Sequence, residues 1–223
     1  MLTGPTIMKF GGTSVEDAGA FQRAAAIAAS AAGMQPVVVV SAIGGFTNAL
    51  LASVTKAIDG DAPAATKSLD NDFERHVAIA NELLGGEARA TVASSIADAK
   101  RAIRQLHKII ASHPVTSQTL QDEIVAFGEL LSSQLFAAVL CENGLVARCV
   151  DARRCIKTDE SYGSAAPLDE TETATQAELL PLFDAGEITV LGGFIGSTSK
   201  GVTTTLGRGG SDYSAAIVGA ALP

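Results

Sequence analysis

Cysteine, aromatic residues and positive charge are scarce in this chain. Tryptophan is absent, aromatic residues make up 4% of the sequence, and there are three cysteines, Cys141, Cys149 and Cys155. An odd, sparse set fits a reducing compartment better than a disulfide framework, so we expect a cytoplasmic protein. No Cys or His spacing is typical of zinc, and the three histidines stand alone, so neither a metal site nor a catalytic histidine is expected.

The acidic balance excludes several classes of partner. With 16 Lys and Arg against 24 Asp and Glu, the formal net charge is −8, which repels nucleic acid and anionic membranes. We find no signal peptide and no apolar run long enough to span a membrane. The 223 residues, 47% of them hydrophobic, can form one domain, with or without a small subdomain. An anionic small substrate would therefore need a local basic pocket.

A lysine precedes the first glycine turn of the sequence. Residues 7–10 have the pattern of a short strand, Gly11 and Gly12 follow, and an alanine-rich helix is expected over residues 16–32. Because the lysine comes before the glycines, this segment is not a Walker A loop. At the end of such a strand Lys9 can face a phosphate while glycine N–H groups approach it. A solvent-exposed strand lysine is the alternative.

A second glycine-rich turn lies near the end of the sequence. A threonine strand at residues 203–205 leads into Gly207–Gly210 and then an alanine-rich helix, whose N-cap we predict to be Ser211 or Asp212. The free N–H groups of a helix N-terminus attract anions, and this turn adds the Arg208 cation and the Asp212 carboxylate. A plain strand-to-helix turn is the alternative, but such turns rarely combine these residues.

Apolar runs between the turns predict a parallel sheet. Four consecutive valines at residues 37–40 show no alternation, which indicates a strand buried on both faces. Glycines and hydroxyl residues follow it, then a helix at residues 49–58. Further strands are expected at 145–151 and 187–191, the latter leading to a hairpin turn at 197–201. Ligands of open α/β sheets bind at the carboxyl ends of the strands, where these glycine turns would meet.

The rest of the pattern is helical, over residues 63–85, 87–112, 117–141 and, after a polar loop at 158–168, over 170–185. In the third of these helices Glu129 lies on a partly apolar flank beside Gly128. A carboxylate in that position can bind an ammonium group. From the residues alone, however, an exposed acid is favoured.

Five ordered segments resemble the motifs of aspartate kinases in the amino acid kinase family: Lys9–Val15, Val40–Ala42 with Thr47–Asn48, Gly128–Leu130, Gly193–Gly196 and Thr203–Ala216. They extend over nearly the whole chain, so together they are specific although each is weak alone. The resemblance implies an α/β fold, a three-layer α/β/α sandwich with a mainly parallel central sheet. The strand pattern supports the same fold independently.

The resemblance also implies a reaction. ATP with Mg²⁺ would phosphorylate the β-carboxylate of L-aspartate to 4-phospho-L-aspartate, the first step toward lysine, threonine and methionine. A carboxylate nucleophile needs no general base, so positioning and charge neutralisation would supply the catalysis. A homodimer or larger assembly is expected, with no nucleic acid or membrane partner.

Residue roles follow from the same resemblance. Lys9 would contact the transferred phosphate and would be held by Asp212. Glu129 would pair with the substrate ammonium group, and Arg208 would bind the α-carboxylate as a bidentate fork that lysine replaces poorly. The remaining assigned residues are hydrogen-bonding groups, namely Ser41, Thr47 and Ser211 toward the substrate and Gly11, Gly12, Ser14, Gly209 and Gly210 toward phosphate. No metal ligand is assigned.

The sequence ends sooner than the family pattern. Family members continue with elements that carry most of the nucleotide site, and then with regulatory ACT domains. We therefore expect residues 1–223 to be the substrate-binding part of the catalytic domain, C-terminally incomplete, with the nucleotide half and ACT domains absent. Two other hypotheses stay open. One is an amino acid kinase acting on glutamate, acetylglutamate or carbamate; the other is a non-catalytic binding or assembly fragment of the kinase.

A first prediction concerns the purified 223-residue chain. Since contacts to aspartate are nearly complete in the sequence and contacts to adenine and ribose are not, this polypeptide should have little or no kinase activity. The measurement is ATP-dependent formation of aspartyl hydroxamate. Robust formation would contradict the expectation.

Overall fold

A parallel sheet lies at the centre of the molecule. The computed structural model describes residues 4–113 and 118–223, and within them four strands form one sheet in the order β1–β2–β5–β3. These strands are β1 (Ile7–Phe10), β2 (Val37–Val40), β5 (Ile188–Gly192) and β3 (Ala147–Val150). Every pairing in it is parallel, with Val38 of β2 between Met8 and Val190. The predicted parallel sheet is confirmed.

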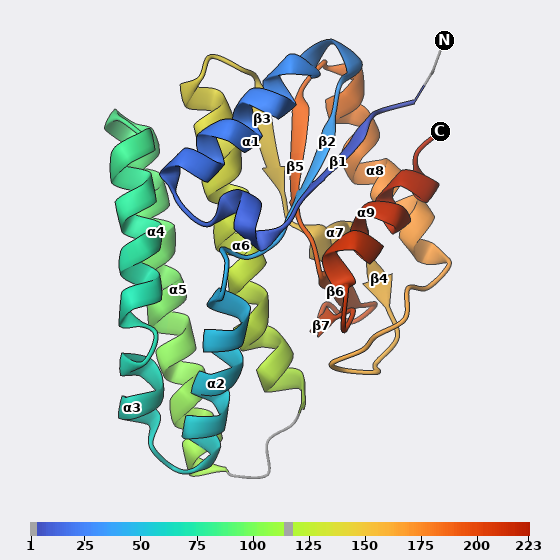
Figure 1. Cartoon of the computed structure of the whole chain (residues 1–223). Coiled ribbons are helices and arrows are strands. Elements are labelled where there is room, and N and C mark those ends of the chain that lie inside the picture. Colours follow the sequence, from blue (N-terminus) through green and yellow to red (C-terminus); the bar gives the residue numbers. More distant parts are fainter. Residues whose placement is uncertain (1–3, 114–117) are drawn as a thin grey trace.

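The valines of β2 belong to two hydrophobic cores, one on each face of the sheet. Helices cover both faces, with α1 (Ala18–Ser30) and α6 (Gln118–Glu142) on one and α8 (Glu170–Asp184) and α9 (Gly210–Ala221) on the other. Val38 and Val40 pack into the first core, whereas Val37 and Val39 pack into the second. Figure 1 shows the resulting layers, which are those of the expected α/β/α sandwich.

A group of helices lies beside and below the sheet, on the left of Figure 1. It consists of α2 (Phe46–Ile58), α3 (Ala62–Lys67), α4 (Asp70–Leu83) and α5 (Gly86–Ser112), which pack on one another and on α6. The prediction of a single helix over 63–85 was wrong, because the chain forms two helices there, α3 and α4. The chain turns at Ser68 and Leu69, and Leu69 is fully buried there. The turn lets α3 contact α2 and α5, while α4 packs along α5 and α1.

A small second sheet lies at the carboxyl end of the main one. It contains β4 (Lys157–Thr158), β6 (Ile195–Thr198) and β7 (Thr203–Thr205) in the order β4–β6–β7. The predicted hairpin is confirmed, because β6 and β7 are antiparallel with Ile195 opposite Thr205. The polar loop at 158–168 folds back on itself through an antiparallel bridge between Thr158 and Pro167. A one-turn helix before it, α7 (Ala152–Cys155), was not predicted and is capped by Asp151.

Helix α6 is buried on nearly all sides. Ile124 and Leu131 of the predicted apolar stripe are buried, and so are Val125 and Phe136 on the other flank. Within the described part of the chain, α6 alone is long and apolar enough to cross a membrane, although no such run was expected from the sequence. However, 72% of its most apolar window is buried inside the protein. Packing in the core therefore accounts for its hydropathy.

The helix that follows the second glycine turn begins earlier than predicted. Its first residue is Gly210, preceded by Gly209 at the N-cap position with φ of 72°, and no side chain caps it. The prediction of Ser211 or Asp212 as the N-cap was therefore wrong. Both residues lie in the first turn of α9, where their side chains are available to the pocket described below.

A second prediction tests the packing of α6 at Gly128. A Cβ added there would lie 2.8 Å from Ala42 Cβ, so Gly128→Ala should overpack this contact at a cost of about 1–3 kcal/mol. The gain in helix propensity offsets about 0.5–1 kcal/mol of that, so the variant should still be less stable than the parent. The measurement is the free energy of unfolding in urea.

Gly33→Ala is the matched control, because an added Cβ at Gly33 meets nothing within 4 Å and the residue is exposed. Its free energy of unfolding should stay within about 0.5 kcal/mol of the parent or increase. Equal stability of the two variants would show that α6 does not press against the β2–α2 loop.

Candidate active site

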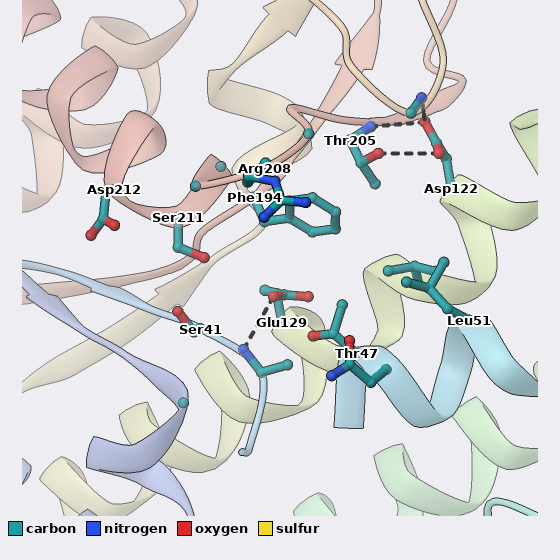
Figure 2. Close-up of a pocket in the computed structure, with 18 of the residues that line it drawn as sticks. Ser41, Thr47, Leu51, Asp122, Glu129, Phe194, Thr205, Arg208, Ser211 and Asp212 are labelled. Atoms are coloured by element: carbon teal, nitrogen blue, oxygen red, sulfur yellow. Dashed lines mark hydrogen bonds between the residues drawn. The ribbon is translucent and has the colours of Figure 1, made fainter. Parts of the chain in front are cut away.

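The ends of several strands and the start of α6 enclose one pocket. Its walls come from the end of β1, the β2–α2 loop, the β6–β7 region and the turn before α9, and its volume is ≈ 680 Å³. Parallel strands place their carboxyl ends at one edge, which is why segments remote in sequence meet here. Figure 2 shows side chains from these segments directed toward a common space.

Most of the residues singled out from the sequence line this pocket. They are Lys9, Gly12, Ser41, Thr47, Glu129, Arg208, Gly209, Gly210, Ser211 and Asp212. Gly11 and Ser14 do not line it. They form the turn behind Gly12, in which the Ser14 N–H donates to the Gly11 carbonyl oxygen at 2.9 Å. Their roles as direct phosphate ligands stay predictions, whereas Gly12 itself is part of the wall.

Lys9 and Asp212, which both line the pocket, form an ion pair. Lys9 Nζ lies 2.9 Å from Asp212 Oδ1, and the side chains are 26% and 75% exposed. Such an exposed pair adds little stability, because solvent screens it. It does restrict where the lysine ammonium group can lie. The pairing suggested by the family resemblance is present, linking the end of β1 to the first turn of α9.

Glu129 is buried against the end of the sheet. Only 2% of the residue is exposed, although the residue pattern alone favours an exposed acid, and that expectation was wrong. Two glycines explain the difference. Gly128 allows α6 to approach Ala42, and a Cβ on Gly192 would lie 3.0 Å from the Glu129 carbonyl oxygen. Glycine at both positions lets the helix contact the strand ends, which places the acid inside.

The Glu129 carboxylate is only half satisfied. Its Oε1 accepts a hydrogen bond from the Ala42 N–H at 3.2 Å, and its Oε2 has no partner among the described residues. Loss of solvation by burial raises the pKa of Glu129 from 4.5 to about 8, more than the Ala42 hydrogen bond lowers it. A buried acceptor without a donor is costly, so this oxygen is suited to a cationic ligand.

Arg208 lies at the rim of the same pocket. Glycines flank it, Gly207 with φ of 75° and Gly209 with φ of 72°, a backbone conformation that other residues rarely adopt. Its side chain is exposed and has no carboxylate partner among the described residues. Figure 2 shows Arg208 and Glu129 on facing sides of the pocket. The site therefore places a buried acid opposite an accessible cation.

Phe194 is a pocket residue that the sequence reasoning did not assign to the site. Its φ is 66°, a strained value for an aromatic residue. The strain is maintained by hydrogen bonds, since the Phe194 N–H donates to Ser214 Oγ at 2.8 Å and its carbonyl oxygen accepts from Leu206 N–H at 2.9 Å. A Cβ at Gly210 would lie 2.6 Å from the Phe194 ring, so this position requires glycine.

Asp122 is the second pocket residue that was missed. It lies two helical turns before Glu129 on α6 and is 1% exposed. A spacing of seven residues places two side chains on the same face of a helix, and this spacing was the available signal.

Metal-binding side chains are not grouped in the described residues. Within residues 4–113 and 118–223, no cluster of three or more His, Cys, Asp or Glu is disposed to hold a metal ion.

Residues 4–223 match the model of the amino acid kinase family. The chain belongs to the amino acid kinase family. Among its relatives, the lysine-sensitive aspartokinase 3 of Escherichia coli K12 is 37% identical over 220 residues, which cover 97% of this chain and 46% of that protein. The aspartokinase of Chlamydia trachomatis is 34% identical over 217 residues, with 97% and 46% covered.

Solved structures show the same similarity. The crystal structure of E. coli aspartokinase III in complex with aspartate and ADP has a TM-score of 0.87 and 36% sequence identity, covering 97% of this chain and 46% of that one. A second structure of that enzyme, with lysine and aspartate, also has a TM-score of 0.87. This amino acid kinase chain thus spans less than half the length of these relatives.

A third prediction concerns the pH dependence of stability. Between the pKa of an unfolded glutamate, 4.5, and about 8, the unfolded chain releases the Glu129 proton and the folded chain keeps it. Stability should therefore fall as pH rises through this window. Glu129→Gln cannot ionise and keeps the acceptor for Ala42 N–H, so at pH 8 it should be more stable than the parent by about 1–3 kcal/mol.

The test is urea unfolding at pH 5 and pH 8. Glu123→Gln is the matched control, because it makes the same change at an exposed acid on the same helix, outside the pocket. If the parent and Glu129→Gln lost stability equally over this range, the ionisation of Glu129 would not be linked to folding.

Proposed function

We propose that this chain is the aspartate-binding part of an aspartate kinase, which transfers phosphate from ATP to the β-carboxylate of L-aspartate and forms 4-phospho-L-aspartate. The observation that carries the proposal is the buried Glu129 facing the cation Arg208, since among the described residues Glu129 Oε2 has no hydrogen-bond partner and Arg208 has no carboxylate partner. Similarity to aspartokinases along 97% of the chain supports it. The pathway served would be lysine, threonine and methionine biosynthesis.

Recognition of the substrate would use its two backbone charges. The α-ammonium group would bind Glu129 Oε2, which has no other donor among the described residues. Its positive charge would favour ionised Glu129, so binding at neutral pH would be accompanied by release of the proton that burial retains. The α-carboxylate would bind the Arg208 guanidinium in a bidentate geometry. An amino acid is then held by the two groups that all amino acids share.

The β-carboxylate would point toward the end of β1. There Lys9, held by Asp212, can neutralise charge between the carboxylate and the incoming phosphate. Ser41, Thr47 and Ser211 place hydroxyl groups in the pocket, and Gly12, Gly209 and Gly210 allow close approach of their backbones. The nucleophile carries its own charge, so these residues have to orient and neutralise it rather than remove a proton.

ATP fits this half of the pocket through its phosphates. The first turn of α9 lies beside Lys9, and the positive end of its helix dipole is a suitable environment for an anion. When bound, ATP would supply the phosphoryl group, and Mg²⁺ would accompany it. Residues 1–223 would form the substrate-binding part of the catalytic domain. Cytoplasmic location and homodimer assembly remain predictions.

The fourth prediction tests aspartate recognition directly by calorimetric titration. The chain should bind L-aspartate, and Arg208→Lys should weaken binding by about tenfold or more, because lysine cannot form the bidentate fork. Arg101→Lys is the matched control. Arg101 is an exposed arginine on α5 outside the pocket, and its replacement should not change the affinity.

A second ligand distinguishes the competing functions. N-acetyl-L-aspartate has no ammonium group, so it would leave Glu129 Oε2 unpartnered and should bind at least about tenfold more weakly than aspartate. Tighter binding of glutamate, acetylglutamate or carbamate would instead favour another amino acid kinase. If the chain bound none of these ligands, L-aspartate included, the proposed function would be contradicted.

A further inference from the structure

Asp122 uses both carboxylate oxygens to hold two other segments of the chain. Its Oδ2 accepts hydrogen bonds from the Gly163 N–H at 2.8 Å and from the Thr205 N–H at 2.9 Å, and its Oδ1 accepts one from Thr205 Oγ1 at 3.1 Å. Figure 2 shows the bonds to Thr205 at the upper edge of the pocket. Asp122 is 1% exposed, so the carboxylate is kept in the interior by these donors.

The two segments that Asp122 holds also contact each other. The Ala165 N–H donates to the Thr205 carbonyl oxygen at 2.8 Å, and a Cβ on Gly207 would lie 3.0 Å from Ser164 Oγ. The loop around residue 163 is thus packed along the end of β7. Arg208 follows three residues after Thr205, at the start of the glycine turn. The backbone segment that carries Arg208 therefore follows directly from Thr205, whose position is fixed by Asp122.

Helix α6 carries both Asp122 and the buried acid Glu129. Asp122 and Glu129 are seven residues apart on it, about 10 Å along the helix axis at 1.5 Å per residue. Glu129 fixes one end of this interval against the β2–α2 loop and β5, and Asp122 fixes the other against β7. The separation between the buried acid and the strand leading to Arg208 is then set by a rigid helix.

We propose that Asp122 is a positioning residue that sets the location of Arg208 relative to Glu129, and so determines how well the pocket binds an α-amino acid. The inference rests on the proposed function, since it assigns the α-carboxylate to Arg208. Asp122 itself does not contact the substrate, because its oxygens already accept three hydrogen bonds within the chain. A second anion facing an α-carboxylate would also repel it.

A double-mutant cycle separates this role from a general contribution to stability. Calorimetric titration with L-aspartate is carried out on the parent, Asp122→Ala, Arg208→Lys and the double variant. Asp122→Ala should weaken binding about tenfold or more. In the Arg208→Lys background the same substitution should weaken it less than about twofold, because the fork that Asp122 positions has already been lost.

Two further variants control for loosening of the loop. Asp122→Asn should bind within about threefold of the parent, since its oxygen can accept from both N–H groups and its amide can donate to Thr205 Oγ1. Asp159→Ala removes an aspartate that holds the same loop through Ser161 and Ala166 N–H groups without bonding to β7. The affinity of Asp159→Ala for L-aspartate should also stay within about threefold of that of the parent.

The outcomes distinguish a failure of the proposed function from a failure of the positioning role of Asp122. If the parent does not bind aspartate, the proposed function fails and the inference fails with it. If the parent binds and Asp122→Ala binds equally well, or its effect is undiminished in the Arg208→Lys background, the inference alone is wrong. Equal weakening of aspartate binding by Asp159→Ala would also overturn the inference.

If Asp122→Ala shows no cooperative unfolding in urea, Thr205→Val replaces it in the cycle. Its affinity for L-aspartate should be about threefold lower than that of the parent, and the same test of non-additivity applies.

Discussion

The carboxyl group of Glu129 lies inside the protein, and one of its two oxygens has no hydrogen-bond partner among the described residues. The site is arranged around that fact. Burying an acid without a partner costs free energy, which the chain avoids in part by keeping the proton. The burial follows from Gly128 and Gly192, which remove the side chains that would separate α6 from the strand ends. A cation that supplies the missing donor would recover the lost interaction, so the site favours a ligand with an ammonium group over one without it.

The rest of the pocket complements this acid. Lys9 and Arg208 both line the pocket and provide positive charge in a protein whose formal net charge is −8, so the basic character is local. Both cations are attached to rigid parts of the fold. Lys9 is on β1 and is paired with Asp212 of α9, and Arg208 follows a strand held by Asp122 of α6. Charge placement thus depends on contacts between elements that are far apart in the sequence, which is how the parallel sheet contributes to binding.

The features predicted correctly are those that local pattern determines. Four valines without alternation predict a strand buried on both faces, and the threonine strand beyond a turn at 197–201 predicts the hairpin. The family resemblance placed Glu129 and Arg208 in one site, although the residue pattern alone favoured an exposed Glu129. Burial of Glu129 depends on Ala42, 87 residues away, and the role of Asp122 depends on Thr205, 83 residues away. Periodicity within one helix contains no information about such contacts, and the start of α9 at Gly210 likewise depends on the conformation of Gly209.

The most direct test of this account is the pKa of Glu129 itself, measured by the pH dependence of its side-chain carboxyl carbon shift in ¹³C NMR. In the free protein the carboxyl group should titrate near pH 8, and with saturating L-aspartate its pKa should fall by about 2 units or more, because the ammonium group stabilises the ionised form. A Glu129 that titrates near the ordinary value of 4.5 in the free protein, or whose pKa does not change when aspartate binds, would contradict the account.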